Sequence, residues 1–129
     1  EIPNATTISR SFLSWNNTLT SIELPNVTNI GDYFLYNNES LTNVELPNAT
    51  TIGHSFLPYN NSLTSIELPN VTNIGDYFLC NNKSLTNVEL PNAEIVGNYF
   101  CSNCKNIETA NIPLKPELEE KLKEQGKHL

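Results

Sequence analysis

Apolar and polar residues alternate along this chain in a pattern that repeats every 22 residues. The string Glu-Leu-Pro-Asn begins at Glu23 and returns at Glu45, Glu67 and Glu89. A fixed period of this size is typical of stacked supersecondary units, each of which buries its apolar side against its neighbours. The full units span Leu19–Ser40, Leu41–Ser62, Leu63–Ser84 and Leu85–Asn106, with a partial unit, Glu1–Thr18, before them and a degenerate one from Ile107 after them.

Each unit opens with an apolar spacing that is typical of a short strand. In the third unit, Ile66 and Leu68 stand two residues apart, so they point the same way from a strand, and Glu67 between them points the other way. Pro69 follows and ends the strand, because proline has no N–H for a ladder. Stacking such units predicts a parallel β-sheet on one face, with the glutamates projecting from it.

The second half of each unit changes to a helical spacing. In the third unit, Ile74, Phe78, Leu79 and Asn82 share one face of a helical turn, and Gly75 stands where the chain must bend tightly or approach its neighbour. We therefore expect short helical turns on the side opposite the sheet. The same columns predict a spine of stacked phenylalanines, formed by Phe12, Phe34, Phe56, Phe78 and Phe100.

The stretch Ser62–Leu79 resembles the BspA-like, or Treponema-type, leucine-rich repeat, whose unit reads roughly L-x-x-I-x-[IL]-P-x-x-V-x-x-I-G-x-x-A-F-x-x-C. The resemblance covers about residues 2–113, although each unit is one residue shorter and only Cys104 keeps the cysteine column. It implies a leucine-rich-repeat solenoid with a parallel β-sheet on its concave face and short helical turns on its convex face. It also implies an extracellular or surface protein of a bacterium, with similar proteins in parasitic protists, that binds other proteins. A cytoplasmic location is the alternative.

The chain divides into a solenoid over residues 1–114 and a tail over residues 115–129. In the tail, Pro116 lies near a predicted helix start, acidic residues follow it, and Gly126 marks the end. We interpret the tail as a C-terminal capping helix, with a short partner-binding helix as the alternative. Nothing caps the first unit, so we expect either further repeats in the native protein or end-to-end self-association through the uncapped N-terminal repeat.

The composition and the motifs of the chain argue against several classes of function. The net charge of −7 disfavours nucleic-acid binding, which needs a basic patch. No run approaches the ~18–20 apolar residues of a membrane span. We find no nucleophile–base pair and no glycine-rich phosphate loop, and His54 occupies a column that holds Asp or Asn elsewhere. We therefore expect no enzyme activity, no catalytic residues and no cofactor.

Cysteine and asparagine columns are interpreted as parts of the stack. Cys101-x-x-Cys104 suggests zinc or a disulfide, but zinc needs four ligands, and Cys80 stands in a column that we expect to face outward. Buried core cysteines are favoured, a disulfide or a metal being the alternatives. The asparagines that close each unit predict an inward-facing amide ladder, comprising Asn38, Asn60 and Asn82.

The candidate site is the row of glutamates on the predicted concave sheet. Neighbouring strands place these carboxylates close together with no lysine among them, and an acidic surface is complementary to a basic protein segment. The candidate partner-binding residues are Glu23, Glu45, Glu67, Glu89, Asn43 and Asn87. Two other interpretations stay open: a structural spacer with a duplicated solvent face, and an intracellular acidic inhibitor that imitates nucleic acid at a basic protein site.

Overall fold

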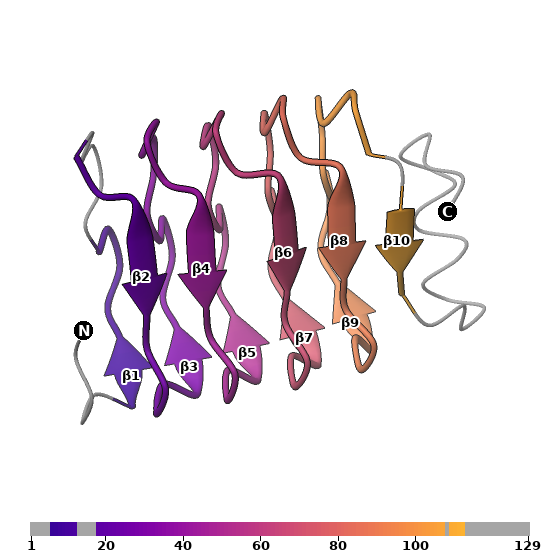
Figure 1. Ribbon diagram of the computed structural model, residues 1–129. Helices are drawn as coiled ribbons and strands as arrows, with labels where there is room; N and C mark the ends of the chain where they lie inside the picture. The colour runs from indigo at the N-terminus through magenta and orange to yellow at the C-terminus, as the bar shows by residue number, and fades with distance from the viewer. Residues whose placement is uncertain (1–5, 13–17, 108, 113–129) are drawn as a thin grey trace.

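The structure, a computed structural model, describes residues 6–12, 18–107 and 109–112. Its regular elements in these ranges are short strands, which lie in two rows along the stack (Figure 1). The strands are β1 (Thr7–Ile8), β2 (Ser21–Glu23), β3 (Asn29–Ile30), β4 (Asn43–Glu45), β5 (Thr51–Ile52), β6 (Ser65–Glu67), β7 (Asn73–Ile74), β8 (Asn87–Glu89), β9 (Ile95–Val96) and β10 (Thr109–Asn111).

The odd-numbered strands form one continuous parallel sheet in the order β1-β3-β5-β7-β9. Thr7 pairs with Asn29 and Ile8 with Ile30, so the pairing advances by one 22-residue unit. Every coil therefore places a residue next to its own counterpart in the coil before. The sequence did not predict this second sheet, because its isoleucines were assigned to a helical segment.

The even-numbered strands form the parallel sheet that the sequence predicted, but in two pieces, β2-β4 and β6-β8-β10. Glu23 pairs with Glu45, and Glu67 pairs with Glu89. We call the side of the stack that carries these four residues the glutamate face. The strands of this face stand side by side in Figure 1.

The expected helical turns are wrong for the part of the chain that the structure describes. After β3, the backbone φ is positive at alternate residues, being 59° at Tyr33, 53° at Leu35 and 56° at Asn37. A right-handed helix needs negative φ at every residue. The N–H of Tyr33 donates to the His54 carbonyl (2.9 Å) and that of Leu35 to the Phe12 carbonyl (3.0 Å), so these hydrogen bonds join coils rather than helical turns. The capping helix predicted over residues 115–129 lies outside the described residues.

The phenylalanine spine is confirmed. Phe34, Phe56 and Phe78 have no exposed surface. Their ring centroids follow one another at 5.5 Å and 5.3 Å, with interplanar angles of 6° and 7°. Rings at this separation are close enough to attract one another in addition to burying area. The spine therefore holds consecutive coils together at their centre.

The glycine column marks a close approach of backbones. A Cβ added at Gly75 would lie 2.8 Å from the carbonyl carbon of Gly53 in the preceding coil and 2.8 Å from Nδ1 of His54. Real side chains do not tolerate such a contact with backbone, so the bend brings the coils closer than any other residue allows.

The asparagine ladder is also confirmed. Asn60 is fully buried, and its side-chain oxygen accepts the backbone N–H of Asn38 at 3.1 Å. Its amide nitrogen donates to the carbonyls of Leu35 and Pro58, at 3.1 Å and 3.0 Å. One side chain thus satisfies three backbone groups that water cannot reach.

The cysteines are buried in the stack. Cys101 has no exposed surface, and the thiol of Cys104 donates to the Leu79 carbonyl at 2.8 Å, as a ladder asparagine would. The core interpretation of this pair is confirmed, and neither cysteine forms a disulfide. The outward position expected for Cys80 is wrong: the residue is 5% exposed, and its thiol donates to the Tyr99 carbonyl at 3.2 Å. A small apolar thiol is readily accommodated in this position.

Candidate functional site

The glutamate row projects from the stack as the alternating strand pattern predicted. Val44 and Leu46, on either side of Glu45, are 6% and 1% exposed, whereas Glu45 itself is exposed. Glu23 and Glu67 are exposed in the same way. The fourth member, in β8, is half-buried. The strands therefore fix the direction of all four side chains, and the row consists of Glu23, Glu45, Glu67 and Glu89.

The row carries negative charge that the described residues do not neutralise. Paired strands lie ~4.8 Å apart, and two carboxylates at that distance repel by about 0.9 kcal/mol even when fully hydrated. Within the described ranges, no lysine or arginine pairs with any of the four. The one histidine–carboxylate contact found there places Nδ1 of His54 3.8 Å from the carboxylate of Asp76 and belongs to another column. Among the described residues, the carboxylates of this face therefore have no cationic side chain in ion-pair contact.

Each of the two candidate asparagines forms a hydrogen bond that joins its own strand to the preceding strand of the glutamate face. The amide of Asn43 donates to the Ser21 hydroxyl at 3.1 Å, which joins β4 to β2. The amide of Asn87 donates to the Ser65 hydroxyl at 3.2 Å, which joins β8 to β6. No such bond joins Asn43 to Ser65. These asparagines thus have a structural role at the edge of the glutamate row.

The backbone ladder of the glutamate face is interrupted between β4 and β6. The N–H groups of Leu24 and Leu68 each donate to the next coil at 3.0 Å. Leu46 occupies the same column between them, and its N–H has no such bond across to β6. The structure records no backbone hydrogen bond between these two strands. The sheet is therefore open at one of the junctions between its described strands.

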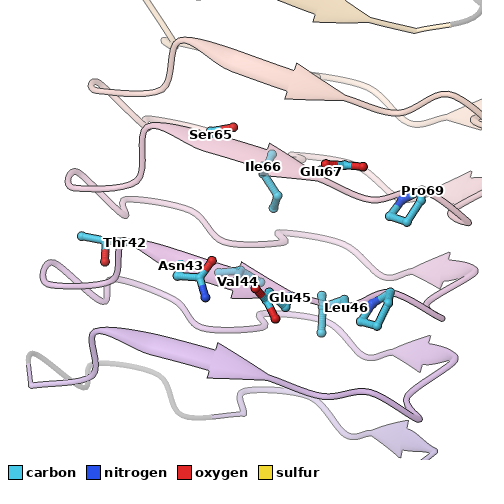
Figure 2. Close-up of a pocket in the computed structure, with 10 residues that line it drawn as sticks. Thr42, Asn43, Val44, Glu45, Leu46, Ser65, Ile66, Glu67 and Pro69 are labelled. Atoms are coloured by element: carbon cyan, nitrogen blue, oxygen red, sulfur yellow. The ribbon is translucent and has the colours of Figure 1, made fainter.

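A groove of about 430 Å³ occupies this opening (Figure 2). Residues of β4 and its flanks form one wall and residues of β6 and its flanks form the other. On the far side of the same two coils the sheet stays closed, because Ile52 pairs with Ile74. The opening is thus confined to the glutamate face. The groove is lined by Thr42, Asn43, Val44, Glu45, Leu46, Pro47, Ser65, Ile66, Glu67 and Pro69.

A second hollow, of about 340 Å³, lies among tyrosines away from the glutamate row. Tyr36 and Tyr59, in its wall, approach to 5.6 Å between ring centroids, and Tyr77 stacks on Tyr99 at 4.8 Å. The rings pack on one another along the stack, which explains their presence over the turns without a ligand.

His54 belongs to a ladder of polar side chains. Its backbone N–H donates to Oδ1 of Asp32 at 2.8 Å, and its Nδ1 accepts the backbone N–H of Asp76 at 2.8 Å. In the described residues there is no group of three or more His, Cys, Asp or Glu side chains arranged to hold a metal ion. The same residues include no helix with the length and apolarity that a membrane crossing requires.

In-register parallel coils with a 22-residue offset define this protein as a repeat solenoid of stacked coils. A profile described as BspA type Leucine rich repeat region matches residues 6–121 in six copies. The chain therefore belongs to the BspA-type leucine-rich-repeat family, whose repeat regions are typically non-enzymatic. No curated protein matches the chain, and no solved structure does.

Proposed function

We propose that this repeat region is a protein-interaction module whose glutamate face binds a basic segment of a partner protein. The observation that carries the proposal is the row of four carboxylates, which paired strands hold in register two by two and which no cation in the described ranges pairs with. Solenoids present extended surfaces that suit long partner segments. Complementary charge speeds encounter and rejects partners of like charge, so nucleic acid is an unfavourable ligand.

Membership of the family favours an extracellular or bacterial cell-surface setting for this module. A partner there would offer a surface rich in lysine or arginine. Because exposed charges are screened beyond about 8 Å at physiological ionic strength, binding through this face should weaken as salt is added.

The test uses a synthetic peptide of alternating basic residues and glycine, labelled for fluorescence anisotropy, over a series of salt concentrations. We expect affinity to fall with salt and to be lost when all four glutamates of the row become glutamine. A control variant with the same charge change elsewhere should bind almost as the parent does, namely Asp32→Asn, Glu39→Gln, Asp76→Asn and Glu94→Gln. Equal losses in the two variants would show that net charge alone is responsible. An absence of binding would favour a structural spacer.

A further inference from the structure

We infer that the groove between β4 and β6 is a specific subsite of the glutamate face and that it takes the side chain of an arginine presented by the partner. This inference rests on the proposed function, because it names the group that the acidic face recognises. It is carried by the interrupted ladder, the volume of the opening and the chemistry of its walls.

The size of the groove fits a side chain and not an added strand. Ligand pockets span roughly 300–1,000 Å³, and this opening of about 430 Å³ lies near the lower end. A strand inserted between β4 and β6 would need a further ~4.8 Å of separation. The coils cannot part so far, because Ile52 stays paired with Ile74 and the rings of Phe56 and Phe78 are stacked at 5.3 Å.

The walls of the groove match a long cationic side chain. Figure 2 shows Glu45 on β4 and Glu67 on β6, so a carboxylate stands on each side of the opening. The buried side chains of Val44 and Ile66, 6% and 2% exposed, form the apolar floor of the groove below the two glutamates, with Pro69 at one end. Arginine and lysine lay their methylene stems along apolar surface while the charged head stays at a polar rim.

Unused backbone groups favour arginine over lysine. The carbonyls of Thr20 and Thr64 accept N–H groups from the next coil, at 2.9 Å and 2.8 Å. Thr42, the same column at the open junction, receives no such bond from β6. A guanidinium has five donors in a planar fork, which is enough for two carboxylates and a carbonyl, whereas an ammonium has three.

The molecule contains its own control for charge. Glu23 and Glu89 belong to the same row, but each faces its neighbour across a junction where the ladder is closed. They offer the same carboxylate chemistry without an opening beside them. Replacing this outer pair removes as much charge as replacing the pair Glu45 and Glu67 at the groove.

The experiment titrates the full chain with three peptides that are identical except for one central residue: arginine, lysine or neutral citrulline. Binding is followed by amide chemical shifts. We expect the arginine peptide to bind at least about threefold tighter than the lysine peptide and to shift the amides of Leu46 and Ser65, while the citrulline peptide shows no binding. Glu45→Gln with Glu67→Gln should weaken arginine binding at least about tenfold, and Glu23→Gln with Glu89→Gln by less than about threefold.

The outcomes separate this inference from the proposed function. Equal weakening by the two double variants, or equal binding of arginine and lysine, would leave an acidic binding face and remove the groove as its subsite. Failure of every basic peptide to bind would remove both. Hydrogen exchange provides an independent readout that needs no ligand. The amide of Leu46 should exchange faster than those of Leu24 and Leu68, and equal protection of all three would show a closed junction and overturn the inference.

Discussion

Replacing Asn60 by alanine tests whether the buried asparagine ladder holds the coils together. The side chain has no exposed surface and connects three backbone groups: the N–H of Asn38 and the carbonyls of Leu35 and Pro58. Asn60→Ala removes all three hydrogen bonds at once. The Pro58 carbonyl still accepts the N–H of Asn37 at 3.0 Å, so the loss falls on the Asn38 N–H and the Leu35 carbonyl. The variant therefore probes the cost of breaking the ladder in the middle of the stack.

The magnitude follows from counting the groups left without partners. A buried donor or acceptor that loses its hydrogen bond costs about 1–3 kcal/mol. Two such groups, the Asn38 N–H and the Leu35 carbonyl, give a loss of at least about 2 kcal/mol in the free energy of unfolding, before any contribution from the small cavity. Because domains are stable by only about 5–15 kcal/mol, the change should be plain in a urea titration followed by circular dichroism.

Two further variants make the measurement specific. Asn60→Cys should recover part of the loss, because the thiol of Cys104 already makes the equivalent bond to the Leu79 carbonyl at 2.8 Å. Asn61→Ala alters an exposed neighbour and should change stability by less than about 0.5 kcal/mol. The reasoning is refuted if Asn60→Ala unfolds at the same urea concentration as the parent, or if the cysteine variant is no better than the alanine variant.

Three other predictions concern the stack. Phe56→Ala should cost about 3–5 kcal/mol, and an unchanged thermal midpoint would contradict the spine. Gly75→Ala should cost about 1–3 kcal/mol because its Cβ meets backbone of the preceding coil, and full stability in a urea titration would show that the coils can move apart freely. Ser65→Asn supplies an amide long enough to bond the side-chain oxygen of Asn43, so it should slow hydrogen exchange at Leu46, and unchanged exchange would show that this contact does not govern the opening.

The repeat alone was sufficient to predict the stacking and the direction of most side chains. Once coils pair with a 22-residue offset, each column is either inside or outside throughout, so Phe56 and Glu45 follow from their places in the unit. The glutamate row required no further information. The position of the glutamate row therefore follows directly from the predicted fold, whereas its binding partner does not.

The path of the backbone between the strands could not be predicted in the same way. Ile74, Phe78, Leu79 and Asn82 have a helical spacing and are all buried, which agrees with the expectation. Yet inward direction does not require a helix, because alternating positive and negative φ brings the same side chains inward. The donors then find acceptors in neighbouring coils, such as the N–H of Leu79 at the Phe56 carbonyl (2.9 Å), which a periodicity argument does not consider.

The groove could not be predicted from the single repeat, because the consensus sequence is the same at every junction between coils. The signal lies in a longer period: Leu19–Ser40 and Leu63–Ser84 are nearly identical, so serine and asparagine alternate between successive strands. Where a strand with serine precedes a strand with asparagine, the asparagine amide donates to the serine hydroxyl of the preceding coil. At these junctions the backbone ladder between the two strands is closed.

At the β4–β6 junction the order is reversed. The amide of Asn43 already donates to the preceding coil, and no hydrogen bond joins Asn43 to Ser65. The β8–β10 junction also begins with asparagine, yet it is closed, and there Thr109 takes the place of serine. Threonine favours the extended backbone more strongly than serine, so the ladder needs less support from side chains. The order asparagine then serine is therefore what marks an open junction, and a stack built from more copies of the same double unit should open again at each recurrence of that order.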